Sequence, residues 1–349
     1  MGRKPTMYDV AERAGVSIAT VSFAFAQPGR VRPSTREAVL AAAAALGYVP
    51  NANARGLARG RTGAIGLYAF DYLLDLTEPA DVLTPNDARL FPQYADEVQR
   101  GVELECRVRG LALMLGAGTP QTALPGDLGV PRVVDIAGRV DGLIAFAGAA
   151  PSDALTRIAG RIPVVELGGM STAEGTRTVV VDNTTGMRGL VEHLLHVHRH
   201  REFRYIGDSR TAEFDARYAA YAATLAGAGV AALPPAHSAP GAEETTRAAV
   251  GDLLAADALP HVIVCSTDQE ALVALDALRD NGVAVPGRVA VTGFDGIVAA
   301  GLSTPGLTTV QQPMQAVGRT AVRLLTGEIT EQSAPLPTAL VLRQSCGCA

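Results

Sequence analysis

The sequence contains no tryptophan, and only four of its 349 residues are cysteine. Four cysteines are too few for a disulfide scaffold, and reduced thiols are typical of the cytoplasm. No apolar run reaches the roughly 18 residues that a membrane span needs, and the first five residues lack the apolar core of a secretion signal. We therefore expect a cytoplasmic protein that has no membrane partner.

Catalytic motifs are also missing from the sequence. There is no phosphate-binding P-loop, no G-x-S-x-G nucleophile motif and no H-E-x-x-H metal motif. No nucleophile is paired with a base, and no two acids form an evident catalytic pair. We therefore expect no enzyme activity, no catalytic residue and no cofactor.

The charge is distributed unevenly along the chain. Residues 1–61 contain nine basic and three acidic side chains, a balance of +6, whereas the whole chain carries −5. The remainder must therefore carry −11. A basic head on an acidic body favours binding of a polyanion such as DNA at one end, although a solvated basic tail would give the same count.

Two short helices with a glycine between them are predicted near the start of the chain. Thr6 is placed to cap the first helix, with Asp9 at its third position, and Gly15 ends it. Ser17 can cap a second helix over residues 18–25. This arrangement is typical of a helix-turn-helix, in which the second helix enters the major groove of DNA.

A third helix is predicted from a capping box at Ser34 and Glu37 to a glycine stop at Gly47. In the first two helices, the residues expected to face inward are Val10, Ala14, Val21 and Phe25. Those left to point elsewhere are Ile18, Ala19, Ser22 and Phe23.

Five stretches of the head have a distinctive residue order: YDVA at 8–11, AGVS at 14–17, ATVS at 19–22, TR at 35–36 and LGYVPN at 46–51. This order resembles the head of the lactose-repressor (LacI/GalR) family of transcription regulators, and the resemblance runs on through the body. It implies a DNA-binding transcription regulator, and family precedent favours a repressor over an activator. A small-molecule-binding protein or a ligand-dependent activator using the same cleft is the alternative.

The resemblance implies roles for individual residues of the head. Ile18 and Ala19 match positions that read base edges, and the positions that hold phosphates or flank the groove are Thr6, Tyr8, Ser17, Thr20, Ser22 and Arg30. Phe23 stands where most members carry an arginine that can bond guanine, so it can offer only apolar contact, for example to a thymine methyl. Alternatively, Phe23 packs on Phe25 or Val31.

Residues 51–60 resemble the hinge helix of the family, which is ordered as a dimeric pair on operator DNA. A segment this short is a poor isolated helix, so the partner chain and DNA must drive its folding. Leu57 matches the wedge inserted into the minor groove, and Asn51, Ala54 and Arg55 belong to the same segment. We expect a homodimer on a pseudo-palindromic operator; a flexible linker is the other interpretation.

The body alternates short apolar runs with helical stretches, which predicts two doubly wound parallel-sheet lobes of periplasmic-binding-protein type behind the all-α head. The runs lie at 64–68, 111–115, 142–146, 163–167, 178–181, 203–207, 262–266 and 289–294. The expected division is a head at 1–61 and a body at 62–349, with one lobe at about 62–180 and 313–338 and the other at about 181–312 and 339–349.

Sheets of this kind bind ligands beyond the carboxyl ends of their strands, so a small-molecule effector is expected between the lobes. The resemblance, shared with periplasmic sugar-binding proteins, implies that Arg217 and Asp268 contact the effector. Phe91 and Tyr94 are plausible stacking surfaces, although the absence of tryptophan weakens the case for a sugar. Asp295 is expected to be a structural cap rather than a ligand.

Two further features have no clear place in this scheme. Residues 70–94 form a longer connection than the family usually has, and we expect them to cover the cleft or add to the dimer contact. Cys346 and Cys348 form a Cys-x-Cys pair with no third or fourth ligand nearby, so terminal packing is expected instead of a metal site. The His-x-His-x-His string at 196–200 is expected to be a solvated turn.

Overall fold

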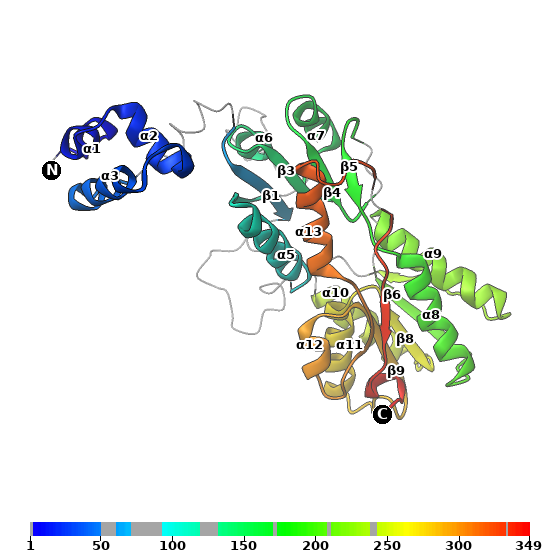
Figure 1. Ribbon diagram of the computed structural model, residues 1–349. Helices are drawn as coiled ribbons and strands as arrows, with labels where there is room; N and C mark the ends of the chain where they lie inside the picture. Colours follow the sequence, from blue (N-terminus) through cyan, green and yellow to red (C-terminus); the bar gives the residue numbers. More distant parts are fainter. Residues whose placement is uncertain are drawn as a thin grey trace, which may run out of the picture. The chain divides into compact units, whose positions relative to one another are not determined.

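The computed structural model describes residues 3–49, 61–70, 93–118, 132–169, 173–207, 211–237, 243–332 and 334–349. The chain divides into two compact units, Met1–Gly63 and Ala64–Ala349 (Figure 1). The predicted hinge at 51–60 and nearly all of the 70–94 connection lie outside the described residues. No helix in the described part of the chain is long and apolar enough to cross a membrane.

The first unit consists of short helices around a small apolar core. Its elements are α1 (Met7–Ala14), α2 (Ile18–Ala26), the 3₁₀ turn η1 (Pro28–Arg30) and α3 (Pro33–Leu46). Val10, Val21 and Val39 are fully buried at its centre. Phe25 packs on the edge of this core with its ring centroid 6.1 Å from that of Tyr48.

The caps predicted for the first two helices are confirmed. Thr6 and Asp9 form a reciprocal capping box, Gly15 adopts a left-handed conformation with φ of 65°, and the hydroxyl of Ser17 accepts from Thr20 N at 3.1 Å. These bonds satisfy amides that have no partner inside the helices.

The capping box predicted at Ser34 and Glu37 is wrong. The third helix begins at Pro33, and Arg32 precedes it without a side-chain cap. Proline suits the first helical position because its fixed φ is preorganised for a helix and the missing amide has no helical partner there. Gly47 ends α3 in the left-handed region, as predicted.

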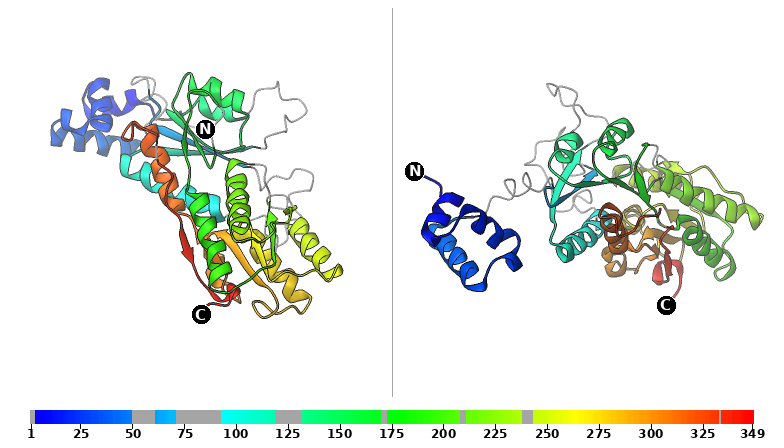
Figure 2. Two further views of the ribbon diagram at one scale, coloured as in Figure 1. Left: turned by 90° about the vertical axis from the view of Figure 1, so that its right-hand side faces the viewer. Right: turned by 45° about the horizontal axis from the view of Figure 1, so that its top comes forward.

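The first lobe of the second unit contains a five-stranded parallel sheet in the order β2-β1-β3-β4-β5. Its strands are β1 (Ala64–Phe70), β2 (Ala112–Gly118), β3 (Gly142–Phe146), β4 (Val164–Leu167) and β5 (Arg177–Val179). Its helices are α5 (Gln93–Arg109), α6 (Arg132–Ala137), α7 (Ser152–Ala159) and α13 (Met314–Leu325). α13 comes late in the chain but packs directly against α5 (Figure 1, Figure 2).

The second lobe contains a six-stranded sheet in the order β11-β10-β9-β8-β6-β7, parallel except for the edge pair β10 and β11. Its strands are β6 (Phe203–Gly207), β7 (Ala236–His237), β8 (Val262–Cys265), β9 (Ala290–Asp295), β10 (Thr308–Gln311) and β11 (Ala339–Val341). Its helical elements are α8 (Asn183–His196), α9 (Ala212–Gly227), α10 (Glu243–Ala255), α11 (Asp268–Asp280), α12 (Val298–Leu302) and the 3₁₀ turn η4 (Gln344–Cys346).

The predicted fold class, a helical head followed by a two-lobed parallel-sheet body, is therefore confirmed. The chain passes from the first sheet to the second after β5, returns with α13 and passes back with β11. Because parallel strands end at one edge of their sheet, polar residues that follow the strands gather at that edge.

Candidate functional site

One face of α2 is exposed while the other is packed in the core of the head. Val21 and Ala24 are 0% and 2% exposed, whereas Ile18 and Phe23 are each 38% exposed and Ala19 is also exposed. The predicted outward orientation of these three residues is confirmed. α2 therefore offers a mostly apolar outer face that can lie against base edges in a groove.

The Phe23 ring is 38% exposed and lies outside the core of the head, and its packing on Phe25 or Val31 stays a prediction. Phe25 and Val31 lie against the core of the head, but Phe23 is not among the residues packed there. Instead, the guanidinium of Arg30 lies over the Phe23 ring, 5.6 Å from its centroid. The ring and the cation form a joint exposed surface beside the end of α2.

The polar groups around this face suit contact with phosphates. Tyr8 is 70% exposed, and the exposed basic side chains of the described head are Arg3, Lys4, Arg13, Arg30, Arg32, Arg36 and Arg61. Asp9 forms an ion pair with Arg3, and the hydrogen bond from the Thr6 hydroxyl is the main factor that lowers the pKa of the Asp9 carboxyl. Its negative charge is thus compensated locally by the cap and by Arg3.

In the second unit, Arg217 is the centre of a buried polar cluster. Its side chain, on α9, is only 2% exposed. Nε donates to Asn183 Oδ1 at 2.9 Å, and Nη1 donates to the Ser266 carbonyl at 2.6 Å and to Asp295 Oδ1 at 3.2 Å. The guanidinium carbon lies 4.0 Å from the ring centroid of Phe294. None of these hydrogen bonds uses Nη2.

The two aspartates of the cluster have different partners. Asp295 accepts from Arg217 and from Gln312 Nε2, the latter at 2.7 Å. Asp268, at the start of α11, is 0% exposed; Oδ2 accepts from the amides of Gly296 and Ile297, and Oδ1 accepts from the Thr309 hydroxyl at 2.5 Å. Both oxygens of Asp268 therefore already hold neighbouring elements together. Burial raises the pKa of both carboxyls, while the Arg217 charge opposes this rise at Asp295.

The first lobe approaches this cluster at two points. Tyr94, the second residue of α5, packs edge-on against Phe146 at the end of β3, and it is among the groups that influence the pKa of Arg217. Glu213, one helical turn before Arg217 on α9, lies so close to Gly168 after β4 that a Cβ on that glycine would be 2.5 Å from Glu213 Oε2. Charged groups of the second lobe thus face the strand ends of the first.

Glu213 has an unusual environment within this cluster. Its Oε1 atom is sealed from solvent and has no hydrogen-bond partner. Burial raises the pKa of Glu213 to about 7, although the nearby Arg217 charge opposes that rise. A carboxyl oxygen without a partner, beside a guanidinium, can accept a hydrogen bond from a hydroxyl or amine group.

The expectation that Cys346 and Cys348 have no further ligands nearby is wrong. The structure places His193 and His198 beside them, within 4.8 Å in terms of the ligand atoms. The histidines lie at the end of α8, and some 150 residues of sequence separate them from the cysteines. Their position in the sequence therefore gave no sign that the four side chains meet.

Two family models match the chain. Residues 6–51 match the model described as bacterial regulatory proteins, lacI family, and residues 191–346 match the periplasmic binding protein-like domain. The HTH-type transcriptional regulator CelR of Thermobifida fusca is 33% identical over 98% of both chains. The HTH-type transcriptional regulator GalS of Salmonella typhimurium is 30% identical over 97% of this chain and 96% of its own.

The chain belongs to the LacI family of bacterial regulatory proteins. It is therefore a helix-turn-helix transcription regulator with a periplasmic-binding-protein-like body, and its relatives are regulators, not enzymes. Among solved structures, the Lac repressor dimer bound to operator and an anti-inducer has the same fold, with a TM-score of 0.78 at 22% identity over 99% of both chains. A complex of CelR with cellobiose has a TM-score of 0.65 at 28% identity, covering 98% of this chain and 99% of that one.

The site residues predicted for this LacI-family chain fall into two groups. Asn51, Ala54, Arg55, Leu57 and Phe91 lie outside the described residues. The described head positions lie on or beside α1 and α2, and Tyr94, Arg217 and Asp268 lie at or near the cluster described above.

Sequence reasoning missed three members of the cluster. It assigned no role in a binding site to Asn183, Glu213 or Gln312. Glu213 and Arg217 are four residues apart and so share a helix face, a spacing that could have indicated the pair. Gln312 carried no such signal, because it approaches Asp295 only through the pairing of β9 with β10.

Proposed function

We propose that this regulator binds a pseudo-palindromic operator in the cytoplasm as a homodimer and represses transcription there. The exposed outer face of α2, flanked by basic side chains, supports this proposal. Ile18 and Ala19 read base edges, while Thr6, Tyr8, Ser17, Thr20, Ser22 and Arg30 position the head on the phosphates. Phe23 adds an apolar contact to the major groove.

The hinge residues complete the DNA contact in this proposal. Leu57 inserts between base pairs in the minor groove, with Asn51, Ala54 and Arg55 beside it. The head then contacts both grooves, and pairing two hinges fixes the distance between the two half-sites.

We infer that the effector is a small polyhydroxylated molecule of the sugar class, bound between the lobes at Arg217. The observation that carries this inference is the burial of Arg217 on the same helix face as Glu213, whose carboxyl lies against Gly168 of the first lobe. A guanidinium and a carboxyl side by side can donate to and accept from neighbouring hydroxyls. The relative crystallised with cellobiose is consistent with this class.

Within the proposed site, Arg217 and Glu213 bind the effector, and Asn183 and Asp295 hold Arg217 in place. Phe91 and Tyr94 supply stacking from the first lobe. The role of Asp268 as an effector ligand stays a prediction, and its three existing hydrogen bonds favour a structural contribution. The 70–94 connection stays a predicted lid or dimer contact.

Effector and operator are coupled through the lobes in this proposal. An effector that binds one lobe arrangement better than another shifts the population toward it, which changes the spacing of the paired hinges and so the operator affinity. For this coupling, the effector must bind the two lobe arrangements with different affinities; tight binding to both would not change the operator affinity.

The proposal is tested by selecting duplexes that bind the full chain from a random library and then screening sugars for release or strengthening of binding. We expect a palindromic consensus and a sugar whose effect is lost in Arg217→Lys, because lysine cannot reproduce the planar guanidinium contacts. Arg247→Lys, at a partly exposed position on α10, is the matched control and should respond like the wild type. A consensus without symmetry, or an Arg217→Lys variant with a full response, would contradict the proposal.

A further inference from the structure

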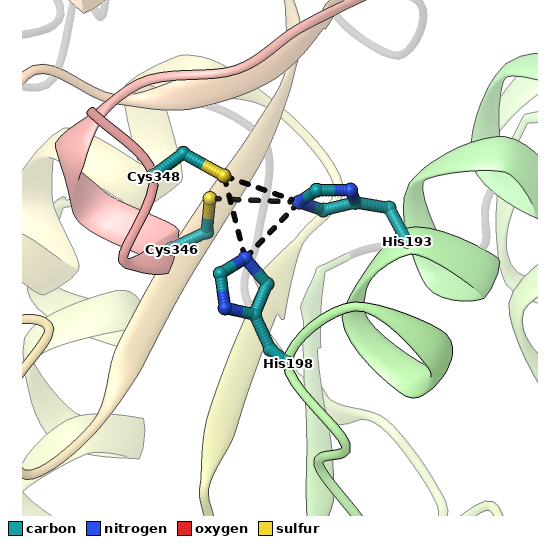
Figure 3. A group of neighbouring side chains, drawn as sticks. All are labelled: His193, His198, Cys346 and Cys348. Atoms are coloured by element: carbon teal, nitrogen blue, oxygen red, sulfur yellow. Dashed lines mark hydrogen bonds between the residues drawn. The ribbon is translucent and has the colours of Figure 1, made fainter.

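Two histidines and two cysteines, side chains of the kind that bind metal ions, converge in the second lobe (Figure 3). His193 lies in the last turn of α8, and His198 follows two residues after the helix ends. Cys346 ends η4, and Cys348 follows it in the C-terminal segment. The ligand atoms of all four side chains lie within 4.8 Å of one another.

Four of the six distances between ligand atoms in this group are close to those of a tetrahedron of zinc ligands. The two Nε2 atoms are 3.1 Å apart, Cys348 Sγ is 3.4 Å from each of them, and Cys346 Sγ is 3.9 Å from His193 Nε2. Tetrahedral zinc with Zn–S near 2.3 Å and Zn–N near 2.05 Å separates nitrogen pairs by about 3.3 Å and nitrogen–sulfur pairs by about 3.6 Å. These four spacings differ from the tetrahedral values by only a few tenths of an ångström, and the two pairs that Cys346 Sγ forms with His198 and Cys348 lie within 4.8 Å.

The backbone holds the two cysteines so that both sulfurs face the histidines. Gly347, between them, has a φ of 100°, a left-handed conformation that other residues rarely adopt. A Cβ at Gly347 would also contact the His198 ring, 3.4 Å from Cε1. The Thr308 hydroxyl on β10 lies 3.1 Å from Cys346 Sγ, within hydrogen-bonding distance of sulfur. Partners of this kind orient a ligand and stabilise a thiolate.

The chemical types of the four ligands indicate which metal ion the group would bind. Two sulfur and two imidazole ligands in a tetrahedral arrangement are typical of zinc, and two thiolates balance its double positive charge. All four positions are occupied by protein ligands, which is typical of a structural site and not of a catalytic one. Among the residues that the structure describes, no other group of three or more histidine, cysteine or acidic side chains meets the geometry for a metal.

We propose that His193, His198, Cys346 and Cys348 bind one zinc ion that fastens the C-terminal segment to the end of α8. Asn183, at the other end of α8, is the residue that accepts from Arg217 Nε. Zinc therefore stabilises the second lobe and fixes the helix that carries a partner of Arg217.

The test uses the full chain without a metal-binding tag, expressed with added zinc, and measures bound metal by mass spectrometry. We expect one zinc per chain in the wild type. In Cys348→Ser and in His198→Asn, the amount of bound zinc should fall about tenfold or more. Cys106→Ala, in the first lobe, and His196→Asn, exposed on the same helix, are matched controls that should keep their zinc.

Two measurements on the wild type make the test independent of how the variants fold. Cobalt added to the metal-free chain should give thiolate-to-cobalt absorption with tetrahedral bands, and zinc should raise the thermal midpoint. The proposal is overturned if the wild type neither retains nor binds zinc, if the cobalt spectrum lacks thiolate bands, if the controls lose as much metal as the ligand variants, or if Cys346 and Cys348 are found joined in a disulfide.

Discussion

At the scale of single residues, the exposed ring of Phe23 sets the expected base preference of the head. Phenylalanine has no hydrogen-bond donor for the O6 and N7 acceptors of guanine, so the base opposite it is read through apolar contact alone. Because Phe23 is 38% exposed and lies outside the core of the head, replacing it should not disturb the fold.

We expect Phe23→Arg to shift the operator preference at one position of each half-site toward guanine. A bidentate arginine contact discriminates between bases by about 1–3 kcal/mol, so the new preference should be roughly 5-fold to 150-fold. The measurement is selection of bound duplexes by the wild type and the variant, with Leu40→Arg on the exposed side of α3 as the control. An unchanged consensus for Phe23→Arg would mean that Phe23 does not face the bases.

Glu213 makes the stability of the body depend on pH. Burial raises its pKa to about 7, so between its ordinary value of 4.5 and about 7 the native state holds a proton that the unfolded chain has lost. This contribution favours folding at low pH and is lost as the pH rises through that interval. The cause is burial of the Glu213 carboxyl, with a smaller contribution from the Asp295 charge, and the Arg217 charge and a hydrogen bond with Asn183 compensate for it only in part.

We expect Glu213→Gln to be more stable than the wild type at pH 8 by up to about 3 kcal/mol, and to differ little at pH 4.5. Urea unfolding of the chain without effector at both pH values measures this difference. Glu192→Gln on the exposed side of α8 is the control. The same stability change at both pH values would show that the carboxyl is not held neutral by the fold.

At the scale of elements, α5 and α13 approach each other more closely than side chains would allow. A Cβ at Gly318 of α13 would lie 2.2 Å from the carbonyl oxygen of Val98, and a Cβ at Gly101 of α5 would lie 2.2 Å from that of Gln315. Both obstacles are backbone atoms, which cannot move as a side-chain tip can. The first lobe therefore depends on these two glycines.

We expect Gly318→Ala to destabilise the chain by about 1–3 kcal/mol, because the helices must separate to admit the methyl group. Gly251→Ala, at an exposed position inside α10 with open space around it, should instead stabilise by about 0.5–1 kcal/mol. Denaturant unfolding of both variants measures the contrast. If Gly318→Ala proved as stable as the control, close helix packing would not be the reason for the glycine.

The elements also show how far the sequence could be interpreted. β3 and β6 begin and end where their apolar runs predict, because parallel strands buried on both faces read as continuous runs. β7 has only two residues, and β11 is mostly exposed, so neither produces such a run. In the candidate effector site, Arg217 was predicted from the resemblance to the family. The metal site could not be predicted, because Cys346 approaches His193 only through the path by which the C-terminal segment returns to the second lobe.

At the scale of the whole molecule, the central claim is that one chain couples operator binding to occupancy of the Arg217 cluster. The head provides a helix with an exposed, mostly apolar face and exposed basic side chains on its other segments, and in the body charged groups of the second lobe face the strand ends of the first. Thermodynamic linkage requires the coupling to be reciprocal: if the effector changes operator affinity by some factor, the operator must change effector affinity by the same factor.

The most direct test measures both affinities for the full chain at fixed salt, once an operator and a sugar effector have been selected. We predict salt-sensitive operator binding and equal reciprocal factors of about 5-fold to 150-fold, which Arg217→Lys reduces toward one. Salt-insensitive binding, or an effector that binds without changing operator affinity, would contradict the account.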